Sequence, residues 1–142
     1  MNEAVITVVS KQIIEGETEE SELICPCSFL YADGFVKIIY DYTVPDGSDT
    51  ITSEIISDGD KVIINQKGSF SSRMEFCTSS GYAGSYTTPF GDLNMNITTV
   101  LLESGMSANG GKIRIEYSLE IAGLMQSFNE IDIEVTPGES EK

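Results

Sequence analysis

The cysteines are the side chains best suited to chemistry in this sequence, and two of them stand one residue apart in Cys25-Pro26-Cys27. Residues i and i+2 of a strand point to the same face, so Cys25, Cys27 and Cys77 could together offer three thiolates to a soft metal. Zinc sites, however, usually separate paired cysteines by two to four residues, and no fourth ligand is evident. We therefore expect buried or half-buried free thiols and no metal site.

The absence of histidine limits the catalytic chemistry open to the chain. It excludes Ser-His-Asp and Cys-His arrangements and metal sites built on imidazole. No lysine or arginine stands within three residues of any cysteine, so no neighbour in the sequence activates a thiol. The carboxylate pairs Asp46/Asp49 and Asp58/Asp60 occupy turn sequences, where aspartate bonds to nearby backbone, and no EF-hand spacing is present. We expect no enzyme and no cofactor.

The net charge of the chain limits the classes of partner that it can bind. Eight lysines and arginines stand against 23 aspartates and glutamates, a formal net charge of −15. Nucleic acids and anionic membranes attract basic proteins, so neither is an expected partner. No stretch approaches the ~20 apolar residues of a membrane helix, and the first residues lack a basic signal-peptide region. An odd cysteine count also argues against a disulfide framework. These features predict a soluble protein of a bacterial cytoplasm.

The elements that must position any site are strands, because period-two alternation and β-branched residues dominate the sequence. Turn sequences such as Asp33-Gly34 and Asn109-Gly110-Gly111 separate them. Since no helix follows Asn109-Gly110-Gly111, we interpret it as a hairpin and not as a phosphate cradle. The predicted strands cover residues 4–13, 22–32, 35–44, 50–57, 61–67, 72–78, 82–88, 93–103, 112–122 and 125–135.

Three segments have other expectations. The acidic run Glu15–Glu22 is predicted to be a solvated turn or a ragged strand end. Residues 101–107 are the best candidate for a turn or two of helix. Residues 1–136 form the predicted domain, and the polar residues 137–142 form a tail that we expect to be disordered.

Each predicted strand is apolar on one face and polar on the other. In residues 35–44, for example, Val36, Ile38, Tyr40, Tyr42 and Val44 share the face that is the better candidate for the core. A flat sheet of eight to ten such strands would leave two open edges and an uncovered apolar face. A sandwich would also bury those faces, but consecutive tight hairpins favour a single antiparallel up-and-down barrel.

The middle of the chain resembles a known family. The pattern is carried by Lys67-Gly68, Ser72–Phe76, Tyr86-Thr87-Thr88-Pro89-Phe90-Gly91, Leu93-Asn94-Met95, Ile97-Thr98-Thr99, Gly110-Gly111 and Ile113–Leu119. It is similar to the YwiB-like family of small bacterial proteins, a domain of unknown function described as a calycin-like β-barrel. The resemblance covers about residues 3–135. It implies a lipocalin-like barrel and carries no catalytic residues to this chain.

The interior of the predicted barrel is the place where a ligand would bind. Tyrosine hydroxyls, thioethers and aliphatic side chains suit a small, largely apolar ligand with few polar anchors. Arg73 faces outward on strict alternation from Met74, but near a rim it could meet an anionic group. The alternative is a filled barrel that acts as a protein-interaction module and forms a homodimer. The candidate ligand-binding residues are Tyr40, Arg73, Met74, Tyr86, Thr88, Met95 and Tyr117.

Overall fold

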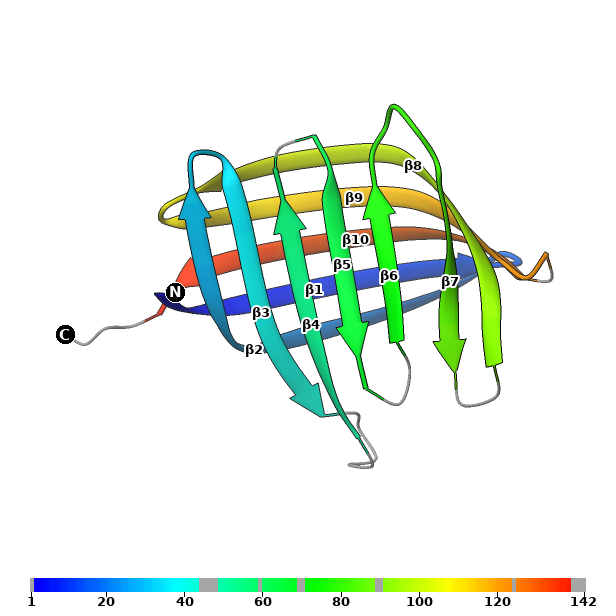
Figure 1. Ribbon diagram of the computed structural model, residues 1–142, viewed down its shortest axis with the longest axis horizontal. Coiled ribbons are helices and arrows are strands. Elements are labelled where there is room, and N and C mark those ends of the chain that lie inside the picture. The colour runs from blue at the N-terminus through cyan, green and yellow to red at the C-terminus, as the bar shows by residue number, and fades with distance from the viewer. Residues whose placement is uncertain are drawn as a thin grey trace.

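Ten antiparallel strands make up the computed structural model, which describes residues 2–43, 49–58, 60–68, 71–88, 91–123 and 125–138. Within these ranges the side chains of Tyr86 and Thr88 lie outside the described part. The strands, labelled in Figure 1, are β1 (Asn2–Ile14), β2 (Glu17–Ala32), β3 (Phe35–Thr43), β4 (Thr50–Ser57), β5 (Val62–Lys67), β6 (Ser71–Phe76), β7 (Tyr82–Thr88), β8 (Gly91–Ser107), β9 (Gly110–Ile121) and β10 (Met125–Pro137).

The strands close into a barrel in the order of the sequence. Each strand pairs with its neighbours along the chain, and β1 pairs with β10 to close the circle. This confirms the predicted all-β, up-and-down barrel. Tight connections between consecutive strands favour this topology because each hairpin places the next strand beside the last. Closure leaves few sheet edges open, and the alternating apolar faces meet inside.

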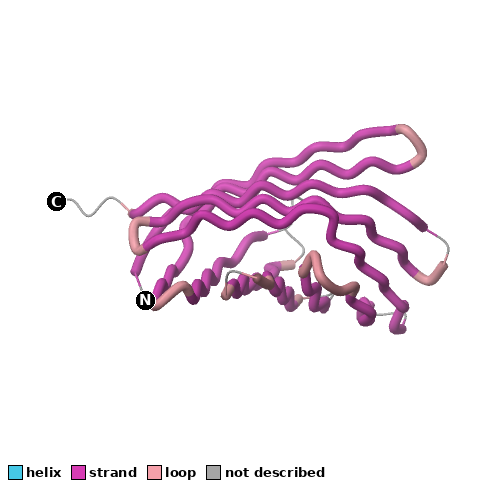
Figure 2. The backbone as a smooth tube through the Cα atoms, turned by 90° about the horizontal axis from the view of Figure 1, so that it is seen from above, coloured by secondary structure: helices cyan, strands magenta, loops and turns pink. Residues whose placement is uncertain are grey.

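The barrel is flattened into two layers (Figures 1 and 2). One layer holds the long strands β8, β9, β10, β1 and β2, and the shorter strands β3 to β7 cross over it. Two strand pairs join the layers. Residues Ser28–Ala32 of β2 pair with β3, and residues Gly91–Ile97 of β8 pair with β7. The remaining lengths of β2 and β8 extend beyond these joints.

Side chains from both layers fill the centre of the barrel. Alternation sends the apolar residues inward, where burial of each large side chain contributes about 1.5–3 kcal/mol relative to exposure. The predicted inward face of β3 is confirmed for Val36, Ile38 and Tyr40, whereas Val44 lies outside the described residues. The side chains with the least exposure are Phe76, Ile6, Ile38, Ile55, Met95, Ile97, Ile113, Ile115, Ile133, Val36, Val62 and Val135.

The acidic run corrects one expectation. Glu15 and Gly16 alone form the turn between β1 and β2, with φ values of 51° and 83°, and Glu17–Glu22 continue as strand β2. The two positive φ values match a two-residue hairpin turn, whose backbone twist suits antiparallel strands. The glutamates remain exposed, so strand pairing with β1 does not require any of these charges to be buried.

Residues 101–107 also differ from the expectation, because they are strand and not helix. A β-bulge between Thr99 and Leu101 shifts the register of β8 against β9. Before the bulge Met95, Ile97 and Thr99 are buried; after it, the even-numbered Leu102 and Met106 pack against the core. A bulge adds one residue and so inverts the alternation, which removed the period-two pattern from this stretch of sequence.

The C-terminal boundary of the barrel lies slightly beyond the predicted one. Pro137 still belongs to β10, and the Gly138 amide donates to the Glu3 carbonyl oxygen at 3.1 Å. The rest of the predicted tail, residues 139–142, lies outside the described residues. Thus the first and last of the described residues lie side by side at one end of the barrel. Figure 1 shows the start of β1 and the end of β10 there.

Candidate functional site

A row of polar side chains crosses the inner face of the long layer. Glu19 on β2 lies opposite Gln12 on β1, and Gln12 lies opposite Asn129 on β10. Asn129 lies opposite Tyr117 on β9, and Tyr117 lies opposite Thr99 on β8. Directly opposed side chains on one face are within contact range of each other. Five adjacent strands therefore place polar groups side by side where the alternation would otherwise supply apolar residues.

A cleft of about 280 Å³ lies over this row. It will be called the Tyr117 cleft, and most of its lining residues belong to the inward-facing positions of their strands. A second cleft of about 370 Å³ shares Gln12 and Glu19 with it and continues toward the β1–β2 turn at Glu15. The Tyr117 cleft is lined by Ser10, Lys11, Gln12, Glu19, Glu20, Ser21, Tyr117, Asn129, Glu130 and Ile131.

Tyr117 is the most deeply placed polar side chain of the cleft. It is 5% exposed, and its ring lies 4.7 Å from the Phe76 ring, centroid to centroid, at a tilt of 59°. Burial raises the pKa of its hydroxyl to about 12, because an ionised phenolate is poorly solvated there. Among the described residues its hydroxyl has no hydrogen-bond partner. Buried tyrosine hydroxyls usually have a hydrogen-bond partner, so the Tyr117 hydroxyl is unusual.

Asn129, which lies opposite Tyr117, makes its hydrogen bond elsewhere. It is 6% exposed, and its Nδ2 donates to the Ser127 hydroxyl at 3.0 Å, two residues along β10. That bond joins the amide to a residue of its own strand and not to the opposed Tyr117. The Thr99 hydroxyl is also engaged, since it accepts from the Cys77 amide at 3.1 Å. Each cross-strand neighbour of Tyr117 thus makes a side-chain hydrogen bond to a residue other than Tyr117.

Carboxylates dominate the rim of the two clefts. Glu15, Glu17 and Glu19 line the segment nearest the β1–β2 turn and are exposed. The one lysine of the lining, Lys11, has its Nζ 3.7 Å from the Glu20 carboxylate. The local field therefore favours a positive charge, and the floor supplies hydroxyl and amide groups.

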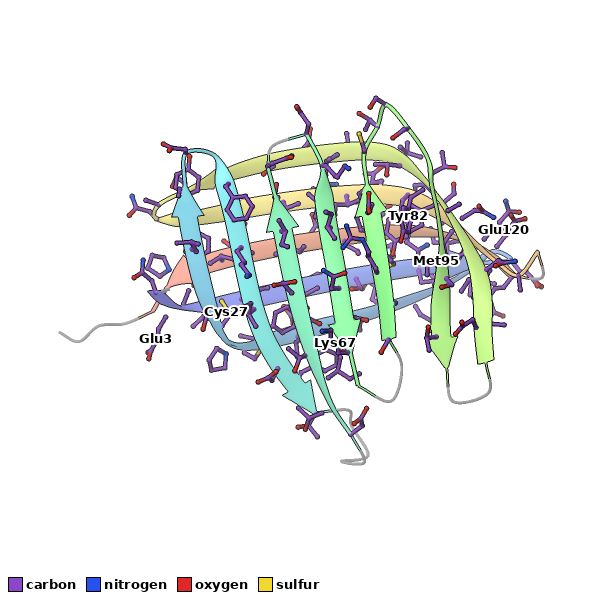
Figure 3. All side chains as sticks on the ribbon, in the orientation of Figure 1. Glu3, Cys27, Lys67, Tyr82, Met95 and Glu120 are labelled. Atoms are coloured by element: carbon purple, nitrogen blue, oxygen red, sulfur yellow. The ribbon has the colours of Figure 1, made fainter. Side chains whose placement is uncertain are left out.

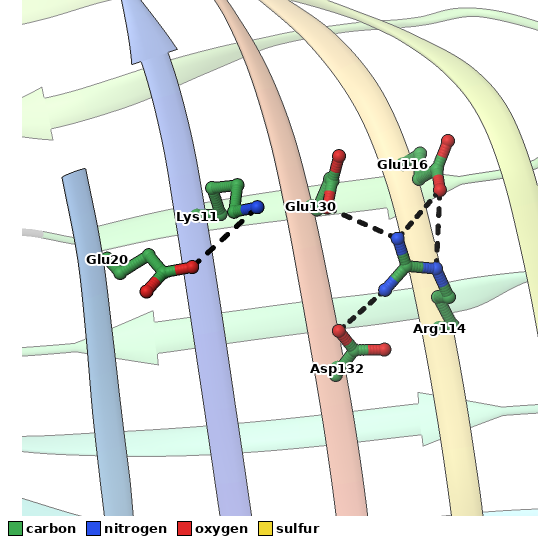
Figure 4. A network of polar contacts seen from close by, with 6 residues as sticks. All are labelled: Lys11, Glu20, Arg114, Glu116, Glu130 and Asp132. Atoms are coloured by element: carbon green, nitrogen blue, oxygen red, sulfur yellow. Dashed lines mark hydrogen bonds and ion pairs between the residues drawn. The ribbon is translucent and has the colours of Figure 1, made fainter. Parts of the chain in front are cut away.

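On the outer face of the long layer, the positively charged side chain of Arg114 pairs with three carboxylates. The Arg114 guanidinium donates to Asp132 at 2.6 Å, to Glu116 at 2.9 Å and to Glu130 at 3.2 Å (Figure 4). These contacts raise the pKa of Arg114, with the Asp132 hydrogen bond the largest cause. Arg114 and Glu130 alternate with the inward-facing residues of β9 and β10, and Glu130 also belongs to the lining of the Tyr117 cleft. Arg114 therefore pairs with one carboxylate of the lining, whereas Glu15, Glu17 and Glu19 have no ion pair among the described residues.

Three of the predicted site residues lie in the packed core. Tyr40 is buried, hydrogen-bonded to Ser53, and its ring is 6.1 Å from that of Tyr42. Met74 packs against the core cluster, and Met95 is 1% exposed. Figure 3 shows Met95 near Tyr82, where β7 and β8 meet. These three residues line the filled centre, and Tyr117 is the member of the predicted set that lines the cleft.

The other three predicted residues do not lie there. Arg73 is exposed on β6, as strict alternation indicates, and its Nε donates to Glu75 at 3.0 Å. Tyr86 and Thr88 belong to β7, where their backbones pair with Leu93 and Gly91, and their side chains lie outside the described part. Their role in ligand binding stays a prediction.

The cleft contains polar residues that the sequence reasoning missed, chiefly Gln12, Asn129, Ser10 and Ser21. A usable signal was present. Along β1 the inward positions change from Ala4 and Ile6 to Ser10 and Gln12, and along β10 they change from Ile131 to Asn129. When the inward-facing positions of a strand change from apolar to polar side chains, the change indicates that this part of the strand lines a cleft and does not pack in the core.

A larger cleft of about 540 Å³ lies near the chain termini, lined in part by Glu3, Cys27, Phe29 and Asn109. Burial raises the pKa of the Cys27 thiol to about 11, and the neighbouring Cys25 adds to the shift. All three cysteines are free. In the part of the chain that the structure describes, no group of three or more Cys, Asp or Glu residues is arranged to hold a metal ion.

Comparison with known proteins identifies a family and a similar solved structure. The family described as Domain of unknown function (DUF1934) matches residues 6–133. The crystal structure of the ywiB protein from Bacillus subtilis is similar, with 17% identity, a TM-score of 0.79, and coverage of 96% of this chain and 92% of that one. No curated protein matches. Across the described ranges, no helix has the length and apolar character that a membrane span requires.

Proposed function

This chain belongs to the DUF1934 family, and we propose that it is a non-enzymatic protein that binds a small, cationic, hydrogen-bonding ligand in the Tyr117 cleft. One observation carries the proposal: the Tyr117 hydroxyl is buried beside a cleft and has no partner among the described residues. Leaving a buried hydroxyl unpaired costs about 1–3 kcal/mol. A ligand that pairs with it recovers this free energy only when bound.

The chemistry of the lining supports a cation. Tyr117, Asn129 and Gln12 offer oxygen atoms that can accept hydrogen bonds, and the Glu19 carboxylate adds negative charge. An amine donates hydrogen bonds and carries the opposite charge, so it satisfies both groups. The cleft volume of about 280 Å³ lies just below the usual range of roughly 300–1,000 Å³ for ligand sites, which suits a small molecule.

The proposal differs from the apolar ligand expected from the sequence. That ligand would occupy the centre of the barrel, where Phe76, Met95 and Ile115 are almost completely buried. Packing at this density leaves little volume for a guest. The polar cleft beside the centre is therefore the better site. We also propose a cytoplasmic location, which the three free cysteines support, because reducing compartments keep thiols unpaired.

Calorimetric titration tests the proposal with 1,4-diaminobutane as the probe and 1,4-butanediol as its neutral counterpart of similar length. At about 0.15 M salt, where the screening length is roughly 8 Å, the diamine should bind and the diol should not. The variant Tyr117→Phe removes one hydrogen bond, worth about 1 kcal/mol, so binding should weaken about fivefold.

Tyr40→Phe is the matched control, because Tyr40 is another buried inward tyrosine but does not line the cleft. It should bind the diamine as the unmodified protein does. Equal affinity of the unmodified protein, Tyr117→Phe and Tyr40→Phe would assign the heat to surface carboxylates and would overturn the proposal.

A further inference from the structure

Strand β2 has an open backbone edge along most of its length. Residues Glu17–Phe29 pair with β1 on one side, but β3 pairs only with Ser28–Ala32 on the other. Over Glu17–Cys27 the described residues supply no second strand. This stretch will be called the β2 edge. In Figure 1 it borders the long layer before β2 bends toward the layer that holds β3.

The β2 edge is accessible over its first part, whereas Cys27 at its end is buried. Glu17–Glu22 are all exposed, and the Ile24 side chain, on the outer face, is 61% exposed. Pro26 lies at the end of the edge, opposite Val5 of β1. Proline has no amide proton and is found where one side of a strand is unpaired. Both features are consistent with a strand that has no neighbour on this side among the described residues.

The charge along the edge determines which partner fits. Four glutamates, Glu17, Glu19, Glu20 and Glu22, lie within six residues, and Glu20 alone has an ion pair among the described residues. A second copy of β2 would place glutamates against glutamates, and directly opposed like charges destabilise a strand pair. A strand that carries lysine or arginine would instead place opposite charges across the new ladder.

We infer that the β2 edge binds an extended, cationic segment of another protein, which adds to the sheet as an antiparallel or parallel strand. The added backbone would pair with those amide and carbonyl groups of Glu17–Cys27 that point away from β1, as in other cases of strand addition. Side chains alternate across a strand, so basic residues at every second position of the segment would face Glu20 and Glu22 on the outer side. An apolar residue two positions further along would cover Ile24.

Two peptides test this inference. The first is a ten-residue peptide that alternates lysine and threonine, and the second has the same sequence with N-methyl groups on alternate residues. N-methylation preserves charge but removes the donors on one edge. The unmodified peptide should bind at least tenfold more tightly, and hydrogen exchange should slow at the amides of Glu17–Cys27. Equal binding of both peptides would overturn the inference, because it would indicate attraction by charge alone.

Two variants locate the site. Glu22→Lys should weaken binding of the unmodified peptide at least fivefold, whereas Glu134→Lys makes the same charge change on the exposed face of β10 and should have a smaller effect. A similar loss in both variants would contradict the inference. Sedimentation of the protein alone should give a monomer. A dimer in which the Glu17–Cys27 amides are protected would show that a second copy occupies the edge, and would also overturn it.

Discussion

Tyr117 and Asn129 lie directly opposite each other on β9 and β10 without a hydrogen bond between their side chains. The Asn129 amide donates to Ser127 instead. A second pair on the other layer behaves differently: Tyr40 lies opposite Ser53 and shares a hydrogen bond with it. Among the described side chains, two buried tyrosines thus occupy equivalent cross-strand positions, and Tyr40 has a hydrogen-bond partner whereas Tyr117 has none.

This contrast predicts opposite effects of the same substitution. Tyr40→Phe removes a bond to Ser53, which is 0% exposed, and should lower the free energy of unfolding by about 1–2 kcal/mol. Tyr117→Phe removes an unpaired hydroxyl and should leave that free energy unchanged or raise it by up to about 1 kcal/mol. Urea unfolding of both variants measures the difference. A loss of stability in Tyr117→Phe comparable to that in Tyr40→Phe would show that its hydroxyl has a partner.

Alkaline pH should weaken the fold through Tyr117. Its pKa rises from 10.0 to about 12 on burial, so the unfolded chain releases this proton first. The stabilisation is complete below pH 10.0 and is lost as pH rises through about 12. At pH 11 the loss from this group should reach about 1.4 kcal/mol. Urea unfolding at pH 8 and pH 11 should show a smaller loss in Tyr117→Phe, and equal losses would contradict the assignment.

The β8–β9 hairpin should depend on Gly111. Its φ is +145°, and a Cβ there would overlap the Gly105 carbonyl oxygen across the ladder. Gly111→Ala should therefore destabilise the fold by several kcal/mol, as severe backbone conflicts do. Gly105 is the control, since a Cβ at that position meets nothing within 4 Å, and Gly105→Ala should change stability by less than about 1 kcal/mol. Thermal unfolding that is equally affected in both variants would refute this packing.

The three thiols should react at different rates. Hydrogen bonds from Ser79 lower the pKa of Cys77, whereas burial raises the pKa values of Cys25 and Cys27. The thiolate is the reactive form, so iodoacetamide at pH 8 should modify Cys77 first and Cys27 last. Peptide mass spectrometry after short exposures gives this order. Modification of Cys27 before Cys77 would contradict the burial described for β2.

The fold could be predicted because local and long-range information agree in most strands. Alternation in β3 and β9 assigns Ile38, Tyr40 and Ile115 to the core, and short turns leave little choice of strand order. The acidic segment before residue 22 was predicted as a solvated turn or a ragged strand end because of its charge, whereas pairing with β1 makes Glu17–Ser21 regular strand. The bulge after Thr99 was missed because it inverts the pattern that is used to recognise strands.

The candidate site was harder to predict from the sequence than the fold. Tyr117 was predicted because it lies on the inward face of a clear strand, but the same reasoning selected Tyr40 and Met95, which are packing residues. What separates them is the neighbour across the ladder. Alternation gives the face of a residue but not its register, so the opposition of Tyr117 and Asn129 required the three-dimensional arrangement.

The central claim is that a small cation binds beside Tyr117, and chemical-shift mapping by NMR tests it most directly. Uniformly ¹⁵N-labelled protein is titrated with 1,4-diaminobutane at about 0.15 M salt, where surface attraction is largely screened. Saturable shifts should concentrate at Gln12, Glu19, Tyr117 and Asn129 and should weaken in Tyr117→Phe but not in Tyr40→Phe. Shifts spread over exposed carboxylates, with these four residues unmoved, would contradict the account.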